Sequence, residues 1–242
     1  MLRYAKRFLL KQIKLWRQDF ASWCRFWKSY KYYKRIAPAG RKPIIKYLYP
    51  CLGDDIEETP IEPIYFYQNA WAFEKIVKQK PIFHVDVGSH HNFVALLSTV
   101  LRVIMVDIRP LSLPLETLEF KKGSILKLPF EDSMVPSVSS ICVIEHIGLG
   151  RYGDAIDPYG TEKAISELKR IVRPGGYLYI SVPIDDENRT YFNAHRAIEE
   201  AYLLSLFEPF KVVDRRYIYG RDLCYTRKFG FGVGCYQLIC PL

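Results

Sequence analysis

The chain has 242 residues, of which 49% are hydrophobic and 25% are charged, and its formal net charge is +9. This length can bury the core of one good-sized domain, and the composition is ordinary for a globular protein. Residues 1–46 hold 14 Lys and Arg against the single acid Asp19, whereas residues 47–242 hold 21 basic and 25 acidic residues. Residues 47–242 therefore have a net charge of −4, which does not favour an active site for a polyanion. Nucleic acid is not expected as a partner.

The cysteine and hydropathy patterns indicate an intracellular protein. None of the six cysteines forms a CxxC pair, and reduced thiols are the expected state in a chain of this size. The early apolar run Phe8–Leu10 is much shorter than a signal-peptide core, and no stretch approaches the roughly 20 apolar residues of a membrane span. We therefore expect a cytoplasmic protein. No metal site is expected, because the histidines lack the carboxylate spacing that is typical of one.

The N-terminal residues 2–36 contain no Pro or Gly and are predicted to form one basic helix, which Pro38–Pro43 ends. Large apolar residues recur at helical spacing, among them Phe20, Trp23 and Trp27. Three interpretations stay open. The helix lies peripherally in an anionic membrane interface at the inner face, packs on the domain, or contacts nucleic acid. Residues 1–46 are thus predicted to be a helical leader.

The rest of the chain divides into a linker and an α/β domain. Residues 47–80 are predicted to be an acidic linker followed by an entrance helix from about Gln68, and residues 81–242 alternate apolar runs with amphipathic stretches. Strands are predicted at residues 82–87, 102–106, 119–121, 138–143, 177–182, 210–217 and 231–239. Helices are predicted after the first strand through about residue 98, over 161–172 and over His195–Phe207. The last two strands leave no room for a crossover helix, which indicates an antiparallel final pair.

Polar groups follow the predicted strands where a ligand would lie. The first strand carries Asp86 and breaks at Gly88 into a loop that opens a helix, and glycine there allows close approach of the backbone to a cofactor. Asp107 ends the second strand about 20 residues later, a spacing that suits an acid binding ribose hydroxyls. Ser124 lies in a loop at the same edge. Structural roles stay open for Asp86, as an anchor of its loop, and for Asp107, as a helix cap.

The most informative stretch is Val138–Pro183, which reads as strand, loop, helix, turn and strand. Its loop begins with Glu145 and His146 at the carboxyl end of a parallel strand, where open α/β sheets bind ligands. Histidine titrates near neutrality, so His146 is predicted to be a general base beside Glu145, with bracing and packing roles as the alternative. Other loop residues are predicted to select the substrate, or to form a network between loops: Arg151, Tyr152, Asp154, Asn193, His195 and Arg196.

The order VDVGS, VDIRP, LPFEDS, ICVIEHI and LKRIVRPGGYLYISVP resembles class I S-adenosylmethionine-dependent methyltransferases over about Ile82 to Val182. The strings EHIGLGRYGDAIDPYG and ENRTYFNAHR, with Tyr65–Gln68 upstream, are similar to the family called domain of unknown function 268. The resemblance implies a Rossmann-like, doubly wound and mostly parallel α/β sheet with an antiparallel last strand, preceded by the basic helix.

The resemblance also implies a cofactor and a reaction. The cofactor would be S-adenosyl-L-methionine, held by Asp86, Gly88, Ser89, Asp107 and Ser124. The expected reaction is O-methylation of a small or glycan-like acceptor, where the glycan rests on the family likeness alone. The chain departs from the superfamily at His90 and Asn92, where glycines are usual, and at Ser124, where an acid is common. The alternative is therefore a catalytically inactive, methyltransferase-shaped scaffold or binding protein. The sequence does not indicate an oligomeric state.

Overall fold

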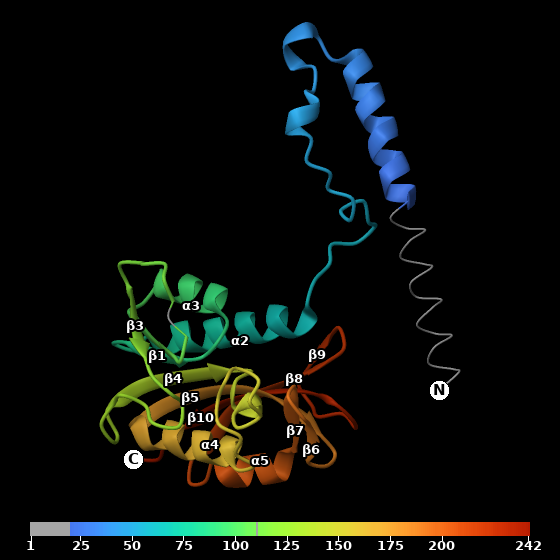
Figure 1. Ribbon diagram of the computed structural model, residues 1–242. Coiled ribbons are helices and arrows are strands. Elements are labelled where there is room, and N and C mark those ends of the chain that lie inside the picture. Colours follow the sequence, from blue (N-terminus) through green and yellow to red (C-terminus); the bar gives the residue numbers. More distant parts are fainter. Residues whose placement is uncertain (1–19, 110) are drawn as a thin grey trace. The chain divides into compact units, whose positions relative to one another are not determined.

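In the computed structural model, residues 20–109 and 111–242 are described (Figure 1). The chain divides into two compact units, Met1–Pro60 and Ile61–Leu242. The division falls at residue 60, whereas the sequence-based boundaries lie at 46 and 80. The entrance helix therefore belongs to the same unit as the sheet.

The described part of the first unit is a helix over residues 20–36 followed by a chain that contains two short 3₁₀ helices, η1 (Ala39–Arg41) and η2 (Ile45–Tyr47). Pro38 follows the end of the helix, as its fixed φ and missing N–H require. An ion pair of 2.7 Å joins Arg25 Nε to Asp55 Oδ2 and ties the later chain to the helix. The predicted helix is thus present over its described part, and residues 2–19 lie outside the described residues.

The second unit is built on a ten-stranded sheet whose main order is β3-β2-β1-β4-β5-β10-β8-β9. The first five of these strands are parallel, and β10 runs antiparallel to both β5 and β8. The predicted mostly parallel sheet with an antiparallel last strand is confirmed. The strands are β1 (His84–Val87), β2 (Val103–Asp107), β3 (Leu118–Lys122), β4 (Val135–Ile141), β5 (Val172–Asp185), β8 (Lys211–Tyr219), β9 (Asp222–Cys224) and β10 (Gly232–Ile239).

Helices cover both faces of this sheet (Figure 1). On one face lie α2 (Pro63–Gln79) and α3 (His91–Ser98), and on the other lie α4 (Gly160–Ile171) and α5 (Glu200–Leu206). Each face has its own apolar core, because successive side chains of a strand point to opposite faces. In β5, for instance, Leu178 and Ile180 belong to the α4 side and Tyr179 belongs to the α2 side.

Two predicted elements are corrected by the structure. The stretch His195–Phe207 is not one helix: β7 (His195–Glu199) precedes α5 and pairs with β6 (Arg189–Tyr191). The strand forms because β5 continues to Asp185 and offers an edge, on which Ile184 is the partner of Ile198. The entrance helix begins at Pro63 rather than near Gln68, since proline suits the first helical position and the Glu62 side chain accepts a hydrogen bond from the Ile64 N–H.

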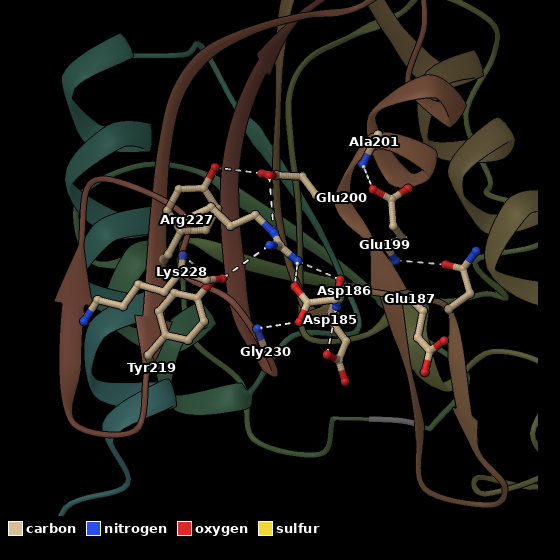
Figure 2. A network of polar contacts seen from close by, with 12 residues as sticks. Asp185, Asp186, Glu187, Glu199, Glu200, Ala201, Tyr219, Arg227, Lys228 and Gly230 are labelled. Carbon is tan, nitrogen blue, oxygen red and sulfur yellow. Dashed lines mark hydrogen bonds and ion pairs between the residues drawn. The ribbon is translucent and has the colours of Figure 1, made fainter.

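A polar network fixes the chain that leads into β10 (Figure 2). The Arg227 guanidinium donates to the Asp186 carboxylate (3.0 Å) and to the Asp185 carbonyl (2.8 Å), and its Nε lies 3.6 Å from Glu200. Asp186 also accepts from the Gly230 N–H at 2.7 Å. These contacts connect the end of β5 to the start of α5 and to the loop before β10. Among the described residues, no helix is long and apolar enough to cross a membrane.

Candidate active site

Two adjoining hollows open at the carboxyl ends of β1, β2 and β4, which is where ligands bind in open α/β sheets. The larger has a volume of about 590 Å³ and the smaller about 100 Å³. Both are lined by Gly88, Asp107, Arg109, Cys142, His146 and Tyr152. Because these residues are shared, one extended ligand can contact both hollows.

The loop after β1 turns at Gly88, whose φ is +73° and whose added Cβ would lie 3.0 Å from a Val143 methyl. Both facts favour glycine at this position. Ser89 follows and is held on two sides: its N–H donates to Asp86 Oδ1, and its hydroxyl accepts from the Ile141 N–H, each at 3.0 Å. The turn is therefore rigid, and α3 begins two residues later beside the larger hollow.

Asp86 lies behind this loop and is fully buried, so it is not part of the lining of either hollow. Its Oδ2 accepts from the Ser139 hydroxyl at 2.5 Å, and Ser139 is 2.8 Å from His84 Nε2. Burial raises the pKa of Asp86 to about 6 and lowers the pKa of His84 to about 3. The structure thus places Asp86 as an anchor of Ser89, one of the two roles that the sequence left open.

His90 and His91 stand beside the turn and both line the larger hollow. The His90 side chain accepts from the Asn92 N–H at 3.3 Å and so caps α3. Its ring stacks on that of His91, with centroids 4.2 Å apart, and lies 5.5 Å from the ring of Tyr65 in α2. His90, one of the two departures from the superfamily's glycines, therefore forms an aromatic wall of the larger hollow together with His91.

Asp107 ends β2 and borders both hollows. Its Oδ1 accepts from the Arg109 N–H at 2.8 Å, whereas its Oδ2 has only a long contact of 3.5 Å to the Arg109 guanidinium. That guanidinium lies 4.7 Å from the ring centre of Tyr152, and the guanidinium of Arg151 lies 5.1 Å from the same ring. Tyr152 is thus held by two cations.

The smaller hollow is a mostly apolar slot beyond Asp107, and Ser124 and Asp154 lie in its lining. Asp154 accepts from the backbone N–H groups of Gly148 (2.6 Å) and Tyr152 (3.2 Å), which lowers its pKa although burial opposes the shift. It therefore shapes the loop that carries Tyr152. The apolar side chains of the slot are Val87, Val106, Ile108, Ile125, Leu126, Val143 and Ile147.

Glu145 and His146 lie in η3 (Ile144–His146), which begins three residues after the end of β4. His146 Nδ1 is 2.6 Å from the Ala194 carbonyl oxygen, and a carbonyl only accepts, so Nδ1 carries the proton and Nε2 keeps its lone pair. Nε2 lies 3.6 Å from Glu145 Oε1. Burial lowers the pKa of His146 to about 4 and raises that of Glu145 to about 8. At neutral pH both side chains are uncharged.

The predicted substrate residues separate into two groups. Arg151, Tyr152 and His195 line the larger hollow. Asn193 and Arg196 line neither hollow. Arg196 instead donates to the carbonyl oxygens of Ile147 (2.6 Å) and Asp157 (3.1 Å) and holds the loop between them, while Asn193 has φ +62° in the turn between β6 and β7. Arg196 thus belongs to the network between loops that the sequence left as the alternative, whereas Asn193 is a turn residue.

Sequence reasoning missed several lining residues: Tyr65, Arg109, Phe231 and Val233. Tyr65 had a signal, since it lies in the upstream string that the family resemblance includes. Arg109 follows Asp107 by two residues and belongs to the same string, VDIRP, so it could have been predicted beside Asp107. Phe231 has no local signal, because it reaches the hollow through the antiparallel position of β10. Among the described residues, no group of three or more His, Cys, Asp or Glu is placed to hold a metal ion.

Comparison with known proteins agrees with this architecture. Residues 127–219 match a family model described as "Caenorhabditis protein of unknown function, DUF268". No curated protein matches the chain in sequence.

Three solved structures have similar folds at low sequence identity. N-methyltransferase NodS from Bradyrhizobium japonicum WM9, in complex with S-adenosyl-L-homocysteine, has TM-score 0.54 at 15% identity, over 80% of this chain and 92% of that one. Burkholderia thailandensis 1,6-didemethyltoxoflavin-N1-methyltransferase, with bound S-adenosylhomocysteine, has TM-score 0.53 at 16% identity, over 74% and 81%. The [4+2]-cyclase SpnF has TM-score 0.53 at 12% identity, over 71% and 81%.

The strand order and these comparisons show a fold similar to that of class I S-adenosylmethionine-dependent methyltransferases. In sequence, residues 127–219 resemble the domain-of-unknown-function 268 family. The cyclase among the similar structures means that the fold alone does not fix the reaction.

Proposed function

We propose that this protein transfers a methyl group from S-adenosylmethionine to an oxygen of a small acceptor, with His146 as the general base. The observation that carries the proposal is the hydrogen bond from His146 Nδ1 to the Ala194 carbonyl, because it leaves Nε2 of a residue that lines the larger hollow with its lone pair. A glycan-like acceptor rests on the family resemblance alone.

The residues present fit a nucleoside-containing cofactor. The apolar slot of the smaller hollow suits a planar base, and Asp107 Oδ2, which Arg109 engages only at 3.5 Å, is available to ribose hydroxyls. The turn at Gly88 admits close approach of a ligand to the backbone, next to the start of α3. When bound, S-adenosylmethionine supplies an activated methyl group.

The acceptor would lie in the larger hollow between the aromatic wall and His146. An acceptor hydroxyl would donate its hydrogen to His146 Nε2, and this nitrogen would take the proton as the oxygen gains the methyl group. The Nδ1–H remains bonded to Ala194 throughout. Glu145, buried beside Nε2 with its Oε2 lacking a hydrogen-bond partner, would orient the acceptor and stabilise the imidazolium when ionised.

Calorimetric titration of the full chain with S-adenosylmethionine and S-adenosylhomocysteine tests the proposal. We expect both to bind, and Asp107→Ala to weaken them by at least about 1 kcal/mol, the scale of a lost hydrogen bond to a charged group. The exposed acid Asp222 provides the control, since Asp222→Ala should leave binding unchanged. No binding of either compound to folded protein would refute the enzyme hypothesis.

A second variant separates binding from turnover. His146→Gln should retain the affinity for S-adenosylhomocysteine while it lowers the methyl-transfer rate by about 10²–10⁴-fold, the usual contribution of a general base. The same affinity with an unchanged rate would remove His146 from the mechanism.

One observation favours a second candidate, a methyltransferase-shaped binding protein without turnover. The ring of His90, stacked on that of His91, lines the larger hollow at a position where the superfamily usually has glycine. The titration distinguishes the two candidates. His90→Gly then tests the wall directly, because a gain of cofactor affinity in that variant would support the binding-protein candidate.

A further inference from the structure

The first unit presents a strip of exposed aromatic rings along the helix over residues 20–36. Phe20 is 72% exposed, Trp23 40% and Trp27 42%. The two tryptophan rings are stacked on each other with centroids 6.4 Å apart. Because the three residues are spaced by three and four positions, they lie on one side of the helix.

The opposite side of the helix is covered by its own unit. Ser22 is buried and Arg25 is paired with Asp55 at 2.7 Å, whereas the half-buried Phe26 and Tyr30 pack edge-on against the tryptophan rings. The fold of the unit therefore buries one side and leaves the tryptophan side open. Large apolar rings in water are unfavourable, so an open strip of this kind indicates a surface for a partner.

The charge around the strip is mainly basic, although Asp55 pairs with Arg25. Residues 20–53 contain eight basic residues and no acid, and all eight are exposed. Coulomb attraction to a negatively charged surface is the interaction that such a group favours. The eight are Arg25, Lys28, Lys31, Lys34, Arg35, Arg41, Lys42 and Lys46.

Aliphatic side chains extend the apolar surface beyond the helix. Ile36 is 59% exposed, Ile44 56% and Ile45 71%. Tyr47 and Tyr49, which follow them, are 71% and 86% exposed. Isoleucine gains free energy from burial among hydrocarbon, whereas tyrosine and tryptophan favour the boundary between hydrocarbon and water.

We propose that residues 20–49 bind the surface of an anionic lipid bilayer, with the aromatic rings and isoleucines at the acyl boundary and the basic residues at the headgroups. A basic amphipathic segment with Trp and Phe on its apolar side is the type that lies in such an interface. The exposed isoleucines favour lipid over single-stranded nucleic acid, because they offer neither stacking nor phosphate contacts. Trp23 and Trp27 are stacked on each other, so each has one ring face fewer on which a base could stack. This surface does not depend on the methyl-transfer proposal.

Co-sedimentation of the full chain with lipid vesicles tests this. We expect binding to vesicles of phosphatidylcholine with about 30% phosphatidylserine, at least tenfold weaker binding to phosphatidylcholine alone, and release at about 0.5 M salt. The double variant Ile44→Asp/Ile45→Asp should lose binding at least tenfold. Its matched control is Ile82→Asp/Leu113→Asp, which changes two exposed aliphatic residues of the other unit and should bind normally.

Folding of each variant is checked by its thermal unfolding midpoint and by its affinity for S-adenosylhomocysteine if the wild type binds it. The proposal is overturned if the full chain does not bind anionic vesicles, or if both double variants lose binding equally. It is also overturned if a single-stranded oligonucleotide binds more tightly than the vesicles and competes them off, since that outcome assigns the surface to nucleic acid.

Discussion

His146 combines a fixed tautomer with a low basicity. Burial lowers its pKa to about 4, so the imidazole alone is a weak base at neutral pH, although its Nε2 is always free to accept. Glu145, 3.6 Å away and with a pKa raised to about 8, is neutral below that pH and charged above it. An adjacent carboxylate stabilises an imidazolium, so ionisation of Glu145 should strengthen the base.

We therefore predict that the methyl-transfer rate increases as pH rises through about 8, the pKa of Glu145, and not through the usual histidine value near 6.5. The measurement is a pH–rate profile at saturating substrates. Glu145→Gln should abolish the rise, because the amide cannot ionise, while Asp154→Asn serves as a control acid at the same site. A pH–rate profile with its midpoint near 6.5 in both the wild type and Glu145→Gln would contradict the coupling of Glu145 to His146.

The sequence identified most residues of the site but not the role of each. Gly88, Asp107 and His146 follow strands, and parallel strands bring their carboxyl ends to one edge, so their proximity was predictable. The burial of Asp86 was not, because its partners Ser139 and Ser89 come from a neighbouring strand and from its own turn. Arg196 was assigned to the substrate for the same reason: its carbonyl partners lie more than thirty residues away.

At the scale of the elements, strands were predicted correctly where the residue pattern of a segment agrees with its pairing in the sheet. The runs that form β1, β2 and β4 contain Val or Ile at several positions and are bounded by turn residues, which is typical of strands in a parallel sheet. The stretch His195–Glu199 lacks such a signal. Its strand depends on the free edge of β5 beyond Pro183, and that edge is a property of the sheet rather than of the segment itself.

Arg227 joins three elements, the end of β5, the start of α5 and the loop before β10 (Figure 2). Its side chain is about one-quarter exposed. Removal of this side chain leaves the carboxylates of Asp186 and Glu200 without their cation. We predict that Arg227→Ala lowers the free energy of unfolding by about 2 kcal/mol, the scale of a lost hydrogen bond to a charged group. Urea unfolding measures this.

The control for Arg227 is Arg189, which also pairs with acids of this region but is about half exposed. Arg189→Ala should lower the free energy of unfolding less than Arg227→Ala does, since the Arg189 side chain is about half exposed to water. Equal losses for the two variants would mean that the network of Figure 2 is not what stabilises the junction.

At the scale of the whole molecule, the uneven charge follows the division into units. The basic residues concentrate before the boundary at residue 60, whereas residues 61–242 hold 21 basic and 21 acidic residues and have no net charge. The sequence predicted this separation from composition. It could not place the boundary, because the entrance helix is tied to the sheet by contacts distant in sequence, such as the 2.9 Å hydrogen bond from Trp71 Nε1 to Asp214.

Limited proteolysis tests whether the sheet-containing unit is stable without the first unit. Residues 48–62 form neither helix nor strand, residues 53–60 are exposed, and the first glutamates of the chain are Glu57 and Glu58. A glutamyl endopeptidase should therefore cut there first and leave a product that starts near Ile61. Because this unit has its own cores on both faces of the sheet, we expect its thermal unfolding midpoint and affinity for S-adenosylhomocysteine to match those of the full chain.

The product is identified by mass spectrometry over the time course, and its unfolding is measured beside that of the uncut chain. The exposed Glu116 and Glu131 serve as internal controls, since cleavage at either would cut within the sheet-containing unit. A first cut at one of these, or a product that unfolds several degrees lower than the full chain, would mean that the first unit contributes to the stability of the second.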